Sequence, residues 1–233
     1  MRNYWLRGCP VRTYYYDSLS SLFPAWETLF AEIVTAHLPS VQDADLQSRM
    51  ERFIAQETAH KNAHHAHNKR IDALDAELGE YRKVAIARKR LKSKIWLAAM
   101  VSIEHIAASI SRRILRKWGF EQGREVSLFR WHSMEELEHK ALAIDLWDYL
   151  GYSREDLKKT AFRNLYYVLR YCANSVVAKL RADGLLGSPR IWTKLGLLGA
   201  DVLWHLAIPH AQLLRSNFHP SEVDDSKLMA QYA

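Results

Sequence analysis

A glutamate followed about thirty residues later by the motif Glu-x-x-His occurs twice in this sequence. Residues three apart on a helix lie on the same face, so each motif can present a carboxylate and an imidazole to one point. The residues are Glu27, Glu57 and His60 in the first copy, and Glu104, Glu136 and His139 in the second. Four helices that each turned one such group inward would gather four carboxylates and two imidazoles, a set with which helix bundles bind two metal ions. The repeat therefore predicts an all-α four-helix bundle with a di-metal core.

The rest of the chain is also expected to be helical, because glycine and proline are scarce, at nine and six of 233 residues. We expect bundle helices from about Pro24 to Pro39, over 43–78, from Trp96 to Trp118 and over 122–150, and further helices over 154–182 and 189–214. Gly79, Gly119 and Gly151 are expected to end three of them. In one domain of residues 1–233, residues 17–151 would form the metal-binding bundle, 152–214 would form C-terminal helices that pack on it, and 215–233 a meandering tail.

The six repeated groups interrupt the apolar stripes of the bundle helices, so they face the core rather than solvent. Four buried glutamates without metals would cost several kcal/mol each in desolvation, or would take up protons. Two divalent cations would neutralise them. Mixed oxygen and nitrogen ligands fit two iron ions, with manganese or a mixed iron–manganese pair as alternatives and zinc less well suited.

Two further histidines lie on the same stripes. His132 precedes Glu136 by four residues, and His64 follows His60 by four. Each could be an additional ligand or could orient a ligand through a hydrogen bond. We favour His132 as a ligand and leave His64 open between the two roles. Glu135 lies off the stripe and is expected to be solvated or structural.

At these positions the chain resembles bacterial proteins named predicted metal-dependent hydrolases, a family similar to ferritin-like proteins. The matching segments are Phe23–Glu27, Phe53–His60, Ile103–His105, Phe129–Ala141 and Phe218–Pro220. The ligand order also resembles that of ferritin-like di-iron N-oxygenases, which oxidise aryl amines. That resemblance implies seven metal ligands, namely Glu27, Glu57, His60, Glu104, His132, Glu136 and His139. With Pro24 near the helix start, Glu27 would lie in the first turn and would be the weakest assignment.

Three functions are consistent with these patterns. The first is a di-iron oxidase or oxygenase that activates O2, draws on an external electron donor and oxidises a small organic substrate, carrier-bound or free. Small residues beside Glu104, namely Ala107, Ala108 and Ser111, could leave room for that substrate. The second is a metal-dependent hydrolase that activates water, and the third is a ferritin-type iron-handling protein.

The charge and cysteine content limit the partners and the compartment. The formal charge is +7, and the basic run over 82–94 would suit an acidic carrier protein or a phosphorylated substrate. No nucleic-acid-reading motif accompanies it, so we expect no nucleic acid partner. Cys9 and Cys172 form no metal-binding spacing and favour a reducing compartment.

Two segments bear on where in the cell the protein is found. The N-terminus lacks the apolar stretch of a secretory signal, and we expect a cytoplasmic homodimer. The stretch Leu195–Leu214 is the most apolar, but it carries Asp201, His205 and His210. It is therefore expected to be a buried or surface-lying helix that allows peripheral membrane contact, rather than a membrane span.

Overall fold

The computed structural model describes residues 4–90, 92–118 and 121–232, and all regular elements within these ranges are helical. The all-α prediction is therefore confirmed. The main helices are α1 (Pro10–His37), α2 (Ala44–Arg70), α3 (Leu74–Arg88), α4 (Ser93–Trp118), α5 (Arg124–His139), α6 (Leu142–Tyr149), α7 (Arg154–Ala182) and α8 (Pro189–Val202). The predicted helix end at Gly119 lies outside the described residues.

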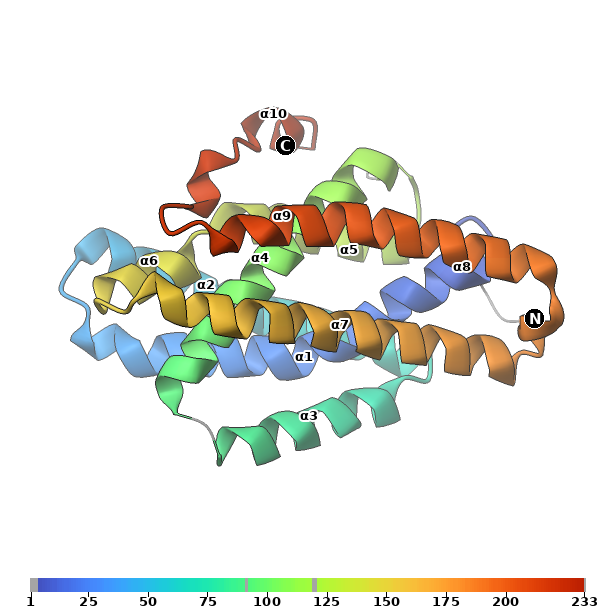
Figure 1. Ribbon diagram of the computed structural model, residues 1–233, viewed down its shortest axis with the longest axis horizontal. Coiled ribbons are helices and arrows are strands. Elements are labelled where there is room, and N and C mark those ends of the chain that lie inside the picture. The colour runs from blue at the N-terminus through green and yellow to red at the C-terminus, as the bar shows by residue number, and fades with distance from the viewer. Residues whose placement is uncertain (1–3, 91, 119–120, 233) are drawn as a thin grey trace.

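Four of these helices form the bundle that the repeat predicts. α1 packs on α2, α2 on α5, α5 on α4, and α4 on α1, so the two hairpins that carry the two copies of the motif close a ring. α3 occupies the longer connection between the hairpins and lies along one side of the molecule, where it packs on α1 and α2 (Figure 1). α7 and α8 pack on the other face of the bundle, against α1, and α7 also packs on α4. Helices α1 and α4 are therefore enclosed on two sides.

α1 begins at Pro10, so the predicted helix start near Pro24 is wrong. Pro24 lies inside the helix, where a proline costs about 3 kcal/mol because it removes a backbone hydrogen bond. The burial of aromatic side chains over residues 14–16 offsets that cost; Tyr16, for example, packs edge-on against Trp118 with ring centroids 5.0 Å apart. Glu27 consequently lies near the middle of a long helix and not in its first turn.

Two other helix ends also differ from the prediction. α2 ends at Arg70, and Gly79 lies inside α3. Asp72 adopts a left-handed backbone conformation with φ of 56°, and the amide of Ala73 donates to the carbonyl of Asn68. This is the Schellman closure that glycine usually provides, which explains why the sequence pattern missed it. The predicted fourth helix is interrupted after His139 and continues as α6, which ends before Gly151.

The C-terminal tail folds back onto the bundle instead of meandering. It forms a short 3-10 turn (Pro220–Glu222) and α10 (Ser226–Met229). Asp225 is buried and accepts two hydrogen bonds of 2.8 Å from the Arg112 guanidinium and one of 2.6 Å from Lys140. These charge-assisted contacts join the tail to α4 and to the end of α5.

The segment Pro189–Leu214 is the one helical stretch among the described residues with the length and composition to cross a membrane. It comprises α8, a π-helical turn (Leu203–Ala207), α9 (Ile208–His210) and a 3-10 turn (Ala211–Leu214). The π turn precedes Pro209, which has no amide hydrogen to donate to the preceding turn. The segment lies along the bundle (Figure 1), and only 11% of its most apolar stretch is buried.

Candidate metal centre

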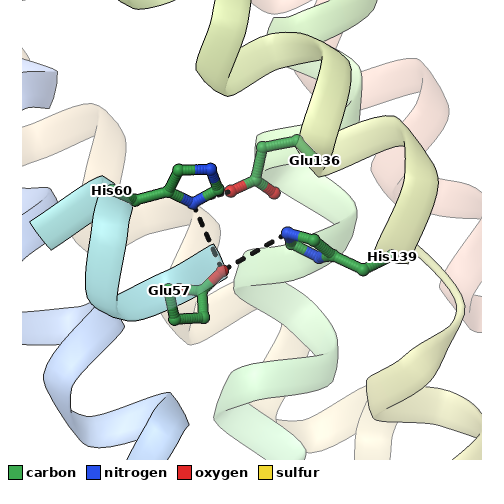
Figure 2. A group of neighbouring side chains, drawn as sticks. All are labelled: Glu57, His60, Glu136 and His139. Atoms are coloured by element: carbon green, nitrogen blue, oxygen red, sulfur yellow. Dashed lines mark ion pairs between the residues drawn. The ribbon is translucent and has the colours of Figure 1, made fainter. Parts of the chain in front are cut away.

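Polar side chains from four helices meet in the middle of the bundle. α1 contributes Glu27, α2 contributes Glu57 and His60, α4 contributes Glu104, and α5 contributes His132, Glu136 and His139. Each has at most 8% of its surface exposed. Figure 2 shows Glu57 and His60 pointing from one helix toward Glu136 and His139 on another. All seven residues predicted from the sequence as ligands are thus brought into one buried region.

His139 connects the two halves of the cluster. Its Nε2 lies 3.3 Å from Oε1 of Glu57, and its Nδ1 lies 3.2 Å from Oε2 of Glu104. Nδ1 of His60 lies 3.5 Å from the same Glu57 oxygen and 4.0 Å from Oε1 of Glu136. One ligand atom from each of Glu57, His60, Glu136 and His139 falls within 4.8 Å of the others, so these four groups could hold one metal ion.

His132 connects the remaining carboxylate to this group. Its Nε2 lies 2.7 Å from Oε1 of Glu136 and 3.8 Å from Oε1 of Glu27. Ligand atoms of Glu27, His64 and His132 also fall within 4.8 Å of one another and could hold a second ion. The two potential sites are adjacent, because Glu136 contacts members of both.

Most buried polar atoms without a hydrogen-bond partner lie in this cluster. Among the described residues, thirteen buried side-chain nitrogen and oxygen atoms have no such partner, and eight of them belong to the predicted ligands. They are both carboxylate oxygens of Glu27, Glu57 Oε1, His60 Nδ1, Glu104 Oε2, Glu136 Oε2 and both ring nitrogens of His139. Unpartnered buried polar atoms are rare in folded proteins. Their convergence on one point fits a site that is completed by cations.

The proton affinities of the glutamates support the same interpretation. Burial, and after it the other carboxylates of the cluster, holds the pKa of Glu27 and of Glu57 well above the ordinary value. Burial also raises the pKa of Glu104 to about 7. Glu136 differs, because the neighbouring histidines, His139 first, outweigh burial and lower its pKa. The four carboxylates cannot all be ionised near neutral pH unless positive charge is added.

Glu135 has a role that the sequence did not reveal. Its Oε2 lies 2.9 Å from Nε2 of His60, and its Oε1 accepts a 3.0 Å hydrogen bond from the Trp131 indole. Burial lowers the pKa of His60, so the ring is neutral. With the proton on Nε2 donated to Glu135, Nδ1 of His60 presents its lone pair to the cluster. Glu135 was predicted to be solvated or structural because it lies off the ligand stripe, and helix spacing alone cannot show a contact with another helix.

A buried hydrogen-bonded chain approaches the cluster from Asn68. The amide nitrogen of Asn68 donates to the backbone carbonyl of Ser20 at 3.0 Å and to Oε2 of Glu77 at 2.8 Å. Oδ1 of Asn68 therefore faces the Ser20 hydroxyl, which donates to it at 2.7 Å. A hydroxyl has only one proton to donate, so Ser20 Oγ must accept from Nδ1 of His64, 2.8 Å away.

This order of donors fixes the tautomer of His64 and the nitrogen of His132 that donates to it. Burial lowers the pKa of His64 well below its ordinary value, so the ring is neutral, with its proton on Nδ1. Nε2 of His64 therefore accepts from Nδ1 of His132, 2.6 Å away. Nε2 of His132 is then the ring nitrogen that faces Glu136, at 2.7 Å, and Glu27, at 3.8 Å. The chain thus favours His132 as the ligand and His64 as the residue that orients it.

The predicted substrate residues lie in a packed region. Ala108 is buried in a cluster with Leu115 and Leu137, and Leu228 and Met229 from the folded tail pack against that cluster. Ser111 is also buried. The tail therefore covers the space that the small side chains leave, and a substrate role for Ala107, Ala108 and Ser111 stays a prediction.

A comparison with protein families finds one that fits this geometry. A family model described as "Predicted metal-dependent hydrolase" matches residues 1–224. The match spans both hairpins and all seven clustered residues. No match was found among curated proteins or among solved structures.

Proposed function

The chain belongs to the family of predicted metal-dependent hydrolases, and from this premise we propose that it is a di-metal enzyme, with two iron ions, that oxidises a small organic substrate with O2. The observation that carries the proposal is the convergence of eight unpartnered buried ligand atoms. Carboxylate and imidazole groups in this proportion suit iron or manganese better than zinc. Two divalent ions would also balance the charge of the four glutamates.

The seven clustered residues would hold the ions. One ion would take Glu57, His60, Glu136 and His139, and the other would take Glu27 and His132. Glu104 lies beside the first group, because its Oε2 is 3.2 Å from Nδ1 of His139. Glu136 contacts a histidine of each group, so it would help to hold both ions. The centre then resembles the carboxylate-rich sites of ferritin-like proteins, with one more imidazole than the repeat alone supplies.

The protein's own residues would prepare these ligands before any ion binds. Glu135 holds the proton of His60 on Nε2, and the Ser20–His64 chain holds that of His132 on Nδ1. His60 then offers a lone pair on Nδ1 without first losing a proton, and His132 is held with Nε2 toward the ions. The charge of Glu136, and after it Glu104, outweighs burial and raises the pKa of His139, so this ring would have to release a proton when a cation arrives.

The closed surroundings admit O2, whereas the organic substrate of either reaction needs a wider route to the centre. All seven side chains are buried, and O2 is a small apolar molecule that can reach such a site. Two ferrous ions supply two electrons to O2 when they are bound. An external electron donor would then be needed to restore the ferrous state for the next turnover.

The second candidate is a hydrolase, favoured by the description of the family. The same ligands could hold two divalent ions that activate water for attack on an ester, amide or phosphate. This reaction requires the substrate to reach the metal-bound nucleophile. The tail over the cluster of Ala108 and Leu137 would have to move, or another route would have to open.

Reconstitution in the absence of oxygen separates the two functions. The metal content of the isolated protein is measured first, and the metal-free protein then receives two equivalents of ferrous iron. On admission of O2 we expect oxygen consumption and a transient charge-transfer absorption band, both absent from Glu57→Ala. A protein that contains zinc, consumes no O2 with iron and hydrolyses model esters or phosphates with zinc would contradict the oxidase.

A further inference from the structure

Large apolar side chains are exposed along one layer of the molecule. We call this layer the α7–α9 face; it consists of α7 and the segment Pro189–Leu214, which lie at the front in Figure 1. Its exposed side chains are Phe162 and Tyr166 on α7, and Trp192, Leu197, Leu203, Trp204 and Ile208 on the segment. Trp204 and Leu197 have 68% and 67% of their surfaces exposed. Large apolar side chains exposed together on one layer of a protein can mark a binding surface.

The same segment is fixed to the bundle by its other side. Ile191 and Leu206 are buried in the core that contains α1 and α4 residues. Asp201 forms an ion pair with Arg113 of α4, with a shortest distance of 2.6 Å, and the Pro209 carbonyl accepts from His105 at 2.8 Å. These contacts hold the helix parallel to the protein surface, with its apolar side outward. It is therefore built to lie against a partner and not to cross a membrane as a free span.

Positive charge is concentrated in the same layer. α7 carries seven lysines and arginines and two acidic residues, and residues 189–214 carry two basic residues and Asp201. Together the two segments hold an excess of six positive charges, most of the formal net charge of +7 of the whole chain. Arg190 and Lys194 are exposed beside Trp192, and Arg163 and Arg170 are exposed on α7 near Tyr166.

We propose that the α7–α9 face docks on the surface of a membrane that is rich in anionic phospholipid. Tryptophan and leucine on one side of a surface helix, with lysine and arginine beside them, are the features with which helices bind in the plane of a lipid interface. Lipid phosphates complement the positive charge, whereas the apolar side chains enter the region below the head groups. A second copy of the chain is a poorer partner. A symmetric contact would place this positively charged face against itself.

Vesicle sedimentation tests the proposal with the full-length protein. One set of vesicles contains equal amounts of phosphatidylglycerol and phosphatidylcholine, and the other contains phosphatidylcholine alone. The test variant combines Leu197→Glu and Trp204→Glu, two highly exposed positions with little packing to lose. The matched control combines Leu78→Glu and Ile86→Glu, which add the same charge at exposed apolar positions on α3. A charge variant, Arg190→Gln with Lys194→Gln, tests the electrostatic part.

We expect the wild-type protein and the α3 control to sediment with the anionic vesicles and not with the neutral ones. The face variant should bind at least about tenfold more weakly, because two large apolar side chains no longer leave water. The charge variant should bind more weakly at low salt, and salt should weaken the binding of the wild-type protein. Three results would overturn the proposal: no binding to anionic vesicles, equal loss in the α3 control, or a stable dimer that the face variant converts to monomers.

Discussion

The centre of the bundle and the α7–α9 face depart from the usual distribution of polar and apolar groups in opposite directions. In the centre, four glutamates and three histidines are buried, and eight of their polar atoms lack partners. On the face, tryptophan, leucine and phenylalanine side chains are exposed to solvent. Both arrangements are unfavourable for an isolated chain in water, one through desolvation and the other through exposed apolar surface.

The two regions differ in how firmly the fold holds them. The centre is surrounded by α1, α2, α4 and α5, and Glu135 and Ser20 orient His60 and His64 by accepting hydrogen bonds from them. The face has no such support on its outer side. A completed centre should therefore change the stability of the whole protein, whereas contact at the face should change its location with little effect on folding.

Removing a carboxylate from the centre should have the largest effect. Glu57→Ala and Glu136→Ala should each reduce bound metal from two ions per chain to one or fewer, because each residue contacts two of the histidines. Elemental analysis after reconstitution measures the metal content. Glu138→Ala, on the same helix at an exposed position, should retain both ions. Full occupancy in the Glu57 or Glu136 variant would show that the cluster is not the metal site.

Weakening the hydrogen bonds that orient the histidines should have the next largest effect. Ser20→Ala removes the acceptor for Nδ1 of His64, so the hydrogen bond that orients the His132 ring loses its support. Loss of such a supporting contact usually weakens metal binding by about 10–100-fold. Ser21→Ala is the matched control, because this buried serine bonds to Ser18 and Tyr171 instead.

Isothermal titration with manganese compares these two serine variants with the wild-type protein. Nitrogen chemical shifts of the metal-free protein report the tautomers directly, since they differ between protonated and unprotonated ring nitrogens. Unchanged shifts of His64 and His132 in Ser20→Ala would contradict the assigned chain even if metal binding fell. Glu135→Gln should weaken binding by a similar factor through His60.

The stability of the metal-free protein should fall as the pH rises from about 4.5 to about 7, the ordinary and the raised pKa of Glu104. In this window the folded protein keeps the proton on Glu104 and the unfolded chain has lost it, so raising the pH favours unfolding. Thermal unfolding at several pH values measures the slope. The slope should be shallower in Glu104→Gln and in the metal-loaded protein. An equal slope in the wild-type protein and in Glu104→Gln would remove Glu104 from this account.

The smallest effect is expected at the basic run over 82–94, which contrasts with the α7–α9 face because part of its charge is already paired. Arg88 contacts Glu32, Lys83 contacts Glu80 at 3.3 Å, and Lys94 contacts Asp156 at 2.7 Å. Reversing the charge of Lys89, Arg90 and Lys92 should weaken the binding of an acidic carrier or substrate in a salt-dependent way. Unchanged kinetics at low salt would contradict docking at this run.

The sequence predicted the inward residues better than the ends of the helices. Glu57 and His60, like Glu136 and His139, face the core because three-residue spacing on a helix is a local property. The helix start at Pro10 was missed because the tertiary burial of tyrosines outweighs the local effect of Pro24. The end of α2 was missed because Asp72 takes the conformation that usually requires glycine.

The sequence by itself determined that the chain is helical and that Glu and His groups would face one core, since periodicity and the charge of buried carboxylates are enough to require both. Only the tertiary structure decided which other residues orient these Glu and His side chains by hydrogen bonds. Glu135 reaches His60, and Ser20 reaches His64, across helices whose relative positions depend on the packing of the whole bundle. The same packing decided that one side of an apolar helix would be buried and the other left outward, because two sides of one helix are distinguished only by what lies against them.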